Sequence, residues 1–593
     1  MFLLEQWAWG QLSAPALQKI ALRSYRDHLS LLRKHGISED NVAKDIQALA
    51  KLGSWGRYQN NVNGDLLKFL GEPSFPKPLL HKVPVKRLKP DHSETNDKIT
   101  IDFPIFCPHI VFSWYYHNDQ RRFQQLFTGG KSTRERVDFW RELAKRKDPR
   151  LDGHPMTSRR RWMAETLALA VHGDGVPVLQ TGRSGAKSFE AYSMQSVFAS
   201  GPTLEVKVYL AGVFGHSIDD NTMMEVWRIL CWSFYFLSKG TWPDVDWFNQ
   251  PWGDDRPSER ALAGQALAGG FCAVVFSLLG DLDHLAKAYK LRHYNANAMC
   301  ELCPAHRDSS HRPRLYNNFD RDATWHKEQF TARQWRALYV GKFLHWLFTL
   351  PGVSQLCLEG DELHVKHLGT SQNFIGSVLA KLVFDIMPDS PSENMSEVWG
   401  KICEYYRRYN PRNQYTNLMV ASFCDETKDH FPKLKGKGAE VKDVLPAVRW
   451  AWNECARGSA DFGFISEMFT NLVDVQNILD DHREHLILPI EQADRIFECT
   501  NKFLLMYQKL AFEAEGRGEM LWAMPTKFHW LYHWAERARY VNPRITNTFL
   551  DEDFVGKWKV LVRSCSAGSE LHHMPQKAAE KYRWATDLLG MKS

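Results

Sequence analysis

Residues 166–180, TLALAVHGDGVPVLQ, decide the fold class of this sequence together with the runs that follow them. The later runs are FEAYSMQSVF (189–198), TLEVKVYLAGVF (203–214), the helical pattern TMMEVWRILCWSFYFLSKG (222–240) and GGFCAVVFSLLGD (269–281). Short runs that are rich in β-branched and aromatic residues and bounded by Gly, Pro and Ser are typical of strands. Three strands, a helix and a further strand predict an α/β domain.

The chain has 593 residues, which is too long for one compact core, so we expect two or three domains. The pattern after residue 371 is mostly helical, and the stretch between 76 and 100 is rich in Pro and Lys, as in a linker. The predicted parts are an N-terminal helical region (1–75), a linker (76–100), a basic and aromatic helical segment (101–164), the α/β core (165–371), an all-helical insertion (372–540) and C-terminal helices (541–593).

Composition narrows the class of protein. The net charge of +6 permits a nucleic-acid partner but does not require one. Eleven cysteines, an odd number, argue against a disulfide framework and favour a reducing compartment with a metal site. The longest apolar stretch, 261–279, is interrupted by polar and glycine residues, and the first residues lack a basic segment before an apolar run. We therefore expect a soluble intracellular protein without a membrane partner.

Two acidic residues stand beside the predicted strands. Asp174 precedes Gly175 between apolar runs, which is a strong signal for a hairpin turn; the alternative is a carboxylate that a central strand presents to a metal ion. Asp281 closes the run FCAVVFSLLGD, so it is either the N-cap of the next helix or a second metal ligand. Asp283 and His284 are near enough in sequence to replace or support it.

The clearest metal-binding pattern is Cys300-Glu-Leu-Cys303, in NAMCELCPAHRD. In a reducing compartment C-x₂-C favours tetrahedral zinc over a disulfide, and it supplies half of the ligands. His306 and His311 are local candidates for the other half.

Two further segments bear on the zinc ligands. Asp361 and His364, in GDELH, have the i, i+3 spacing of one helical face, so they are zinc candidates or else polar residues of a solvated helix. A zinc ion shared by the cysteines, His364 and a fourth group would fasten the helical insertion to the core. His529 and His533, in KFHWLYHW, lie at i, i+4 on one helical face, and we interpret them as interior or DNA-facing residues, with metal binding as the less favoured alternative.

A late group of acids lies at 551–553, in TNTFLDEDFVGKWKV. Carboxylates in the first turn of a helix are stabilised by the helix dipole, which is their ordinary structural role. The functional alternative is that one of them, with Glu552 as our choice, completes a metal site.

Taken together, these motifs resemble the catalytic region of CACTA-type (En/Spm-like) transposases, and the Plavaka and Kyakuja–Dileera–Zisupton groups are especially similar. The matching words are HGDGVPV, LLGDLDHLAKAYKL, CELC and GDELH, and the closing block PTKFHWLYHWAERARYVNPRITNTFLDEDFVGK is also similar. The resemblance spans roughly residues 100–590 and is firm only at the motifs.

The resemblance implies a ribonuclease-H-like core and a DDE/D nuclease and strand transferase. Asp174, Asp281 and Glu552 would form an acidic triad that holds two Mg²⁺ or Mn²⁺ ions, because hard divalent cations prefer carboxylate oxygen. The zinc site would be structural, because thiolates close its coordination shell. The implied partner is double-stranded DNA with terminal inverted repeats, the implied compartment is the nucleus, and a homo-oligomer is one option.

Two alternatives remain beside the active transposase. The first is a transposase-derived protein that binds DNA or a protein partner without catalysis. The second is an unrelated hydrolase-like enzyme, which ranks low because the sequence has no G-x-S-x-G elbow, Walker loop or dinucleotide-binding fingerprint.

Overall fold

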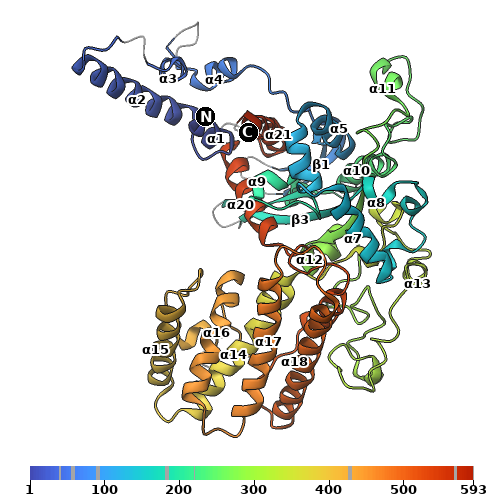
Figure 1. The fold of residues 1–593 in the computed structure, drawn as a ribbon, viewed down its shortest axis with the longest axis vertical. Coiled ribbons are helices and arrows are strands. Elements are labelled where there is room, and N and C mark those ends of the chain that lie inside the picture. The colour runs from blue at the N-terminus through green and yellow to red at the C-terminus, as the bar shows by residue number, and fades with distance from the viewer. Residues whose placement is uncertain are drawn as a thin grey trace. The chain divides into compact units, whose positions relative to one another are not determined.

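The computed structural model describes residues 1–38, 42–54, 60–88, 94–180, 186–219, 221–424, 430–566 and 570–591. It contains two compact units, drawn in Figure 1. The sheet unit comprises Met1–Lys131, Glu165–Val274 and Leu550–Ser593, and the helical unit comprises Ser132–Ala164 and Val275–Phe549. Both units are assembled from distant segments of the chain, and the core predicted at 165–371 is divided between them.

A mixed four-stranded sheet has the strand order β5-β4-β3-β6. Its strands are β3 (Thr166–Gln180), β4 (Ala186–Ser196), β5 (Val208–Phe214) and β6 (Cys272–Leu279), and helix α10 (Thr222–Lys239) lies between β5 and β6 in the chain. The pairs β3–β4 and β4–β5 are antiparallel. Every residue of β5 and β6 is buried, which explains why both strands have continuous apolar sequences. The predicted α/β fold with a mixed sheet is confirmed at this level.

The segment predicted as a linker is instead part of a β-hairpin. Strands β1 (Leu79–Leu88) and β2 (Glu94–Ile105) pair antiparallel. Val83 and Val85 are buried, whereas Lys82 before them is exposed and Pro84 between them is partly exposed. This alternation has the period of a strand with one buried face, and the Pro and Lys content of the segment obscured it.

Helix α20 (Phe549–Ser564) covers one face of the sheet. Its Trp558 stacks on Tyr209 of β5 with ring centroids 3.7 Å apart, and it lies parallel to the ring of Phe189 of β4. The remaining helices of the sheet unit are α1 (Phe2–Ala8), α2 (Ala14–Lys34), α3 (Lys44–Ala50), α4 (Val62–Leu70), α5 (Pro108–Asn118), α6 (Gln120–Phe123), α9 (Thr203–Val206), α11 (Pro257–Leu262) and α21 (Met574–Met591). The C-terminal helices thus complete the core around the sheet.

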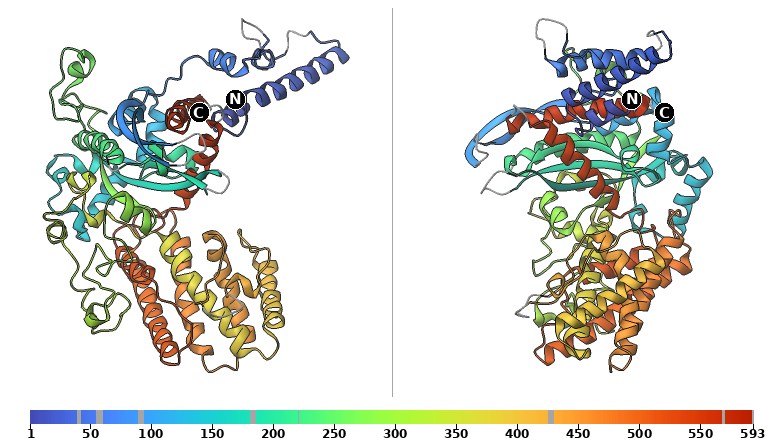
Figure 2. Two further views of the ribbon diagram at one scale, coloured as in Figure 1. Left: turned by 180° about the vertical axis from the view of Figure 1, so that it is seen from behind. Right: turned by 90° about the vertical axis from the view of Figure 1, so that its left-hand side faces the viewer.

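The helical unit contains a bundle in which α15 packs on α16, α16 on α17 and α17 on α18; these helices are labelled in Figure 1, and Figure 2 shows the bundle from two further sides. Apart from short 3-10 helices, the helices of this unit are α7 (Thr133–Lys145), α8 (Trp162–Glu165), α12 (Leu282–Ala288), α13 (Ala332–Ala337), η10 (Glu362–Ser371), α14 (Gln372–Lys381), η11 (Leu382–Ile386), α15 (Pro391–Tyr409), α16 (Gly438–Cys455), α17 (Phe462–Asp481), α18 (Ile490–Gly516) and α19 (Lys527–Arg537). A capping box of Ser390 and Glu393, followed by Pro391 in the first turn, fixes the start of α15.

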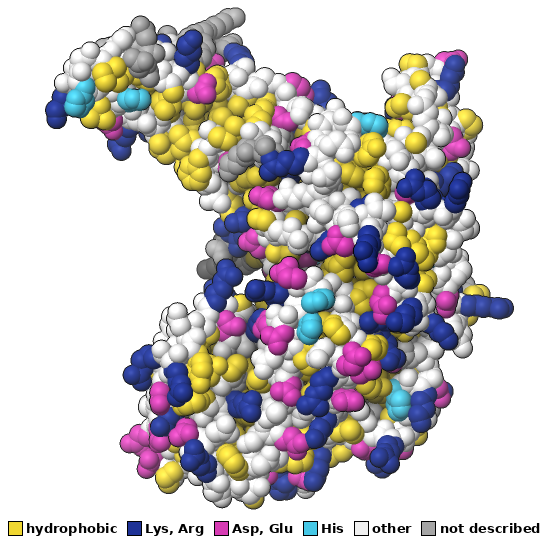
Figure 3. All heavy atoms as spheres, in the orientation of Figure 1, with side chains coloured by type: hydrophobic (Ala, Val, Ile, Leu, Met, Phe, Trp, Pro, Cys, Tyr) yellow, Lys and Arg dark blue, Asp and Glu magenta, His cyan; other side chains and the backbone are white. Residues whose placement is uncertain are grey.

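On the face of the helical unit drawn in Figure 3, basic and acidic side chains are interspersed. Within the described ranges, no helix combines the length and the apolar character needed to cross a bilayer.

Candidate metal centre

Four buried side chains of the helical unit, Cys300, Cys303, His529 and His533, bring their ligand atoms together. The four atoms all lie within 4.8 Å of one another. The cysteines come from the loop that follows α12, and the histidines lie one turn apart on the same face of α19. The group therefore joins two segments that are more than 200 residues apart in the sequence.

The distances within the group are those of a tetrahedral metal site. The Sγ–Nε2 distances are 3.7 Å from Cys300 to His533 and 3.3 Å from Cys303 to His529, and the two Nε2 atoms are 3.1 Å apart. A tetrahedral zinc ion with Zn–S of about 2.3 Å and Zn–N of about 2.05 Å sets S···N at about 3.6 Å and N···N at about 3.3 Å. This buried Cys₂His₂ group can bind a metal such as zinc.

The protonation of the two thiols is coupled. Burial opposes ionisation of Cys300, but the hydrogen bond from Cys303 and the two neighbouring imidazoles hold the pKa of Cys300 well below its usual value. Burial and the adjacent Cys300 raise the pKa of Cys303 well above its usual value. Each thiol thus alters the pKa of the other, and a bound divalent cation would stabilise both thiolates.

Polar groups outside the Cys₂His₂ group lie behind both imidazoles. Nδ1–H of His529 donates to the backbone oxygen of Tyr316 at 3.1 Å, which leaves Nε2 as the ligand atom. Nδ1 of His533 lies 3.6 Å from a carboxylate oxygen of Glu536. The ring of Trp325 packs against His529 with centroids 4.3 Å apart and helps to exclude water. A carbonyl and a carboxylate behind the two imidazoles are the outer partners expected of metal-binding histidines.

Glu301, the residue between the cysteines, fixes the C-x₂-C loop. Its buried carboxylate accepts hydrogen bonds from Nε1 of Trp335 at 2.6 Å, from the hydroxyl of Tyr339 at 2.9 Å and from the backbone N–H of Arg292 at 2.8 Å. The Arg292 guanidinium also donates to the backbone oxygen of Cys300. The backbone N–H of Leu302 donates to Sγ of Cys300 at 3.3 Å, as in other thiolate loops that bind metals.

The structure corrects our choice of the other zinc ligands. Asp361 and His364 form a separate hydrogen-bonded group, because the Asp361 carboxylate caps η10 through the N–H groups of Leu363 and His364, each at 3.0 Å. It also accepts from Thr548, at 2.9 Å from the backbone N–H and 2.6 Å from the hydroxyl. Nδ1 of His364 lies 2.5 Å from the same carboxylate. The protein itself therefore satisfies this acid.

His306, one of the two local candidates, is also outside the Cys₂His₂ group. His306 is half-buried, and its Nδ1 accepts the backbone N–H of Asp308 at 3.3 Å. The side chain of His311 is outside the described ones.

The sequence did contain a signal for the missing ligands. C-x₂-C leaves two ligand positions open, and the i, i+4 spacing of His529 and His533 places two imidazoles on one helical face. We interpreted them as interior or DNA-facing residues; they are interior, but they face the thiols. The pairing escaped sequence analysis because nothing local indicates which histidine pair meets a given C-x₂-C.

Asp174 lies inside strand β3, not in a turn. It is opposite Ala191 in the ladder, and β3 continues to Gln180, so the hairpin-turn alternative is wrong. Its carboxylate is half-buried and accepts the N–H of Gly175 at 2.7 Å. Because side chains two residues apart point to the same face of a strand, Asp174 shares the face of His172.

Asp551 shows which sheet face α20 covers. Its buried carboxylate contacts the Lys207 ammonium and lies 3.3 Å from Nδ1 of His172. Helix α20 therefore packs on the face of β3 that carries Asp174. Burial lowers the pKa of Lys207, although Asp551 opposes this shift. Asp551 is committed to this ion pair, whereas Glu552 and Asp553 are exposed and Asp553 lies 3.9 Å from Lys557.

Asp281 follows β6 by two residues and caps α12. Its Oδ1 accepts the backbone N–H of His284 at 2.6 Å, so the N-cap alternative is confirmed. An N-cap carboxylate keeps one oxygen for other contacts, so capping does not by itself exclude metal binding. Asp283 instead pairs with Lys287 and His293.

Comparison with known proteins adds no assignment. No protein-family model matches the sequence, and no curated protein matches it either.

Proposed function

We propose that this chain is a DDE/D-type DNA nuclease and strand transferase with a ribonuclease-H-like core, as in a cut-and-paste transposase. Asp174, Asp281 and Glu552 are its acidic triad in this proposal. Double-stranded DNA at transposon ends is its substrate, and the nucleus is its compartment. The observation that carries the proposal is the position of Asp174 on an internal strand, on the sheet face that α20 covers.

The strand order supports this proposal. Three antiparallel strands are followed by a helix and by a fourth strand, which lies next to the first strand in the order β5-β4-β3-β6. A ribonuclease-H-like core is expected to have this arrangement. The first acid then belongs on the first strand and the second acid directly after the fourth strand. Asp174 on β3 and Asp281 after β6 meet these two requirements.

The third acid comes from the helix that returns to the sheet. The packing of α20 against β3, through Asp551 and His172, brings residues 551–553 to the sheet face of Asp174. Asp551 is neutralised by Lys207, which makes it a poor metal ligand. Its neighbour Glu552 is exposed in the first turn of the same helix, so we retain Glu552 as the third acid.

The chemistry follows from the ligand type. Asp174, Asp281 and Glu552 would hold two Mg²⁺ ions, which would supply Lewis-acid chemistry for the activation of water or of a DNA 3′-hydroxyl and for the leaving oxygen. The three carboxylates fit this role because hard divalent ions prefer carboxylate oxygen. The Cys₂His₂ group has a different task, because four protein ligands leave no open position for substrate.

Cleavage of DNA tests the proposal. We expect Mg²⁺-dependent nicking of a duplex that carries the element's own terminal repeat, and a loss of at least 100-fold in Asp174→Asn and Asp281→Asn. Asp254→Asn is the matched control, because this exposed acid pairs with Arg260, lies outside the acids considered for the triad and should keep full activity. Equal cleavage by all four proteins would refute the triad. Binding of the duplex without any cleavage would favour the transposase-derived DNA-binding protein instead.

A further inference from the structure

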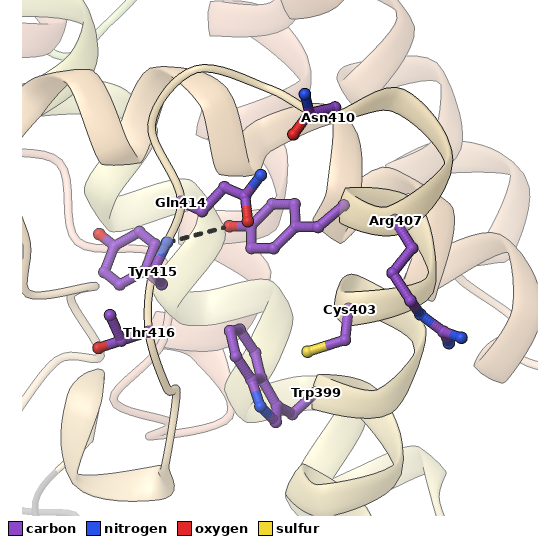
Figure 4. Close-up of a pocket in the computed structure, with 8 residues that line it drawn as sticks. Trp399, Cys403, Arg407, Asn410, Gln414, Tyr415 and Thr416 are labelled. Carbon is purple, nitrogen blue, oxygen red and sulfur yellow. Dashed lines mark hydrogen bonds between the residues drawn. The ribbon is translucent and has the colours of Figure 1, made fainter.

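A pocket of about 560 Å³ opens beside the C-terminal half of α15 in the helical unit, far along the chain from the three proposed catalytic acids. Figure 4 shows its two walls: Trp399 and Cys403 project from the helix, and Gln414, Tyr415 and Thr416 line the facing loop. The other lining residues are Tyr406, Arg407 and Asn410. Its volume lies within the range of about 300–1,000 Å³ that is usual for sites of small ligands.

The aromatic wall of this pocket is held in place by the protein. Trp399 is half-buried and meets the ring of the buried Tyr406 edge to face, with centroids 6.1 Å apart. The hydroxyl of Tyr406 accepts the backbone N–H of Tyr415 at 3.4 Å, drawn as a dashed line in Figure 4. The hydroxyl of Tyr415 in turn donates to the backbone oxygen of Lys435 at 3.1 Å. The rings are therefore positioned before any ligand arrives.

Glycine permits this close packing of the loop. A Cβ atom at Gly436 would lie 1.9 Å from the hydroxyl of Tyr415, and the backbone there has φ of +156°. A larger residue at 436 would displace the tyrosine that forms one wall of the pocket.

The rim of the pocket is basic and rich in amides. Residues 407–416, RRYNPRNQYT, contain three arginines and no acid. The exposed Arg407 lines the pocket, and the next arginine, Arg408, lies over the rings of Tyr409 and Trp450, 5.5 Å from each centroid. Two acids are close to this loop: Asp443 accepts hydrogen bonds from Asn413 at 2.9 Å, and Glu440 acts electrostatically on Tyr415. Neither acid is among the residues that line the pocket, whereas Arg407 is, so the lining itself favours an anionic ligand.

We propose that this pocket binds an unpaired base of a single-stranded nucleic acid. A half-buried indole offers a stacking surface, the amides of Asn410 and Gln414 can hydrogen-bond to a base edge, and Arg407 can pair with the adjoining phosphate. A base inside a duplex is stacked on both faces and cannot present its ring to Trp399. The site thus distinguishes single strands from duplexes, and this inference does not depend on the metal chemistry proposed above.

Fluorescence anisotropy with labelled ten-nucleotide oligothymidine tests the inference, with oligouridine of the same length and a duplex hairpin as further probes. The full chain is used, in buffer without Mg²⁺, so that a failure of the nuclease proposal leaves the result intact. We expect Trp399→Ala to weaken binding of a single strand by about tenfold or more, because stacking on an aromatic ring contributes that much. Hairpin binding should change less than twofold.

Three further variants separate stacking from charge and from misfolding. Trp399→Phe retains a ring and should recover most of the affinity, and Arg407→Gln should lower the dependence of binding on salt by about 0.7 in the log–log slope. Trp450→Ala removes a tryptophan outside the pocket, and its circular dichroism is compared with that of Trp399→Ala. Unchanged single-strand affinity in a folded Trp399→Ala variant would overturn the inference. An equal loss for strand and hairpin would also overturn it, since that result indicates a general electrostatic surface.

Discussion

Each of the two units contains a cluster of buried polar side chains, and the two clusters are stabilised in opposite ways. In the sheet unit, Asp551 is neutralised by Lys207 and contacts His172, so the protein supplies the opposite charge. In the helical unit, Cys300 and Cys303 face two imidazoles, and none of the four ligand side chains carries a fixed positive charge. The second cluster gains its full stabilisation only when a cation is added.

This difference shows how to recognise a metal site by its chemistry. Burial of polar atoms alone is a poor criterion, because Asp361 is as deeply buried as the thiols and is satisfied by backbone N–H groups and Thr548. A better criterion is a set of converging ligand atoms whose charges and lone pairs are not satisfied by other groups of the protein and are therefore available to an ion. We expect metal removal to affect the Cys₂His₂ group and to leave the other two clusters unchanged.

The largest effect should come from loss of the thiols. Cys300→Ser with Cys303→Ser should reduce bound zinc from about one per chain to almost none, because structural zinc contributes about 10–16 kcal/mol in small domains. That is comparable to the whole stability of most folds, about 5–15 kcal/mol, so the helical unit should lose its native packing. Metal analysis and near-ultraviolet circular dichroism measure both. Cys357→Ser, which changes a buried thiol outside the group, is the control; zinc retained by the double variant would contradict the site.

Breaking the ion pair in the sheet unit should have the next largest effect. Lys207→Met leaves Asp551 buried without its cation, which should lower the free energy of unfolding by about 3–5 kcal/mol. The double variant Lys207→Met with Asp551→Leu should recover much of this loss, and zinc content should stay at the wild-type level in both. Urea denaturation measures the stabilities. A single variant as stable as the wild type would show that the pair is unimportant.

A smaller effect is expected at Asp361. Thr548→Val removes one hydroxyl donor from a buried carboxylate while the backbone N–H of residue 548 remains, which should cost about 1–3 kcal/mol. Thr546→Val is a matched control, because this buried hydroxyl has only a long contact of 3.5 Å with a backbone oxygen. The comparison fails if the two variants unfold at the same urea concentration.

The smallest effect concerns the pH dependence of stability. It comes from a buried titratable group that stays neutral in the folded protein. Burial lowers the pKa of His109 to about 3, so the folded protein keeps this imidazole uncharged while the unfolded chain takes up a proton near pH 6.5. Stability therefore falls as the pH drops below 6.5, by about 1 kcal/mol between pH 6.5 and 5.5 from this residue. His109→Asn should reduce the pH dependence of unfolding by that amount. Identical pH profiles would contradict the assignment.

Strands of the four-stranded sheet could be predicted from the sequence, whereas the hairpin of β1 and β2 could not. Strands β5 and β6 are uniformly apolar because both faces are buried, so short-range pattern alone identifies them. Strands β1 and β2 were missed because Pro84 and several lysines resemble a linker, and only the pairing shows that the valines between them face inward. Local composition and tertiary pairing conflict there, and pairing determines the structure.

Two of the four ligands of the metal centre could be predicted from the sequence. The C-x₂-C spacing identifies two ligands, because the loop itself holds both sulfurs near one point. The other two lie more than 200 residues later on α19, and their choice over His364 depends on how the chain folds back. For the acids, the sequence indicated Asp174, Asp281 and the group 551–553. Only the buried Lys207 separates Asp551 from Glu552.

Zinc K-edge X-ray absorption on the purified chain tests the Cys₂His₂ centre most directly. We expect two sulfur scatterers at about 2.3 Å from zinc and two nitrogen scatterers at about 2.0–2.1 Å, with the outer-shell pattern of imidazole rings. A first shell of oxygen and nitrogen alone, or of three or four sulfur atoms, would contradict it.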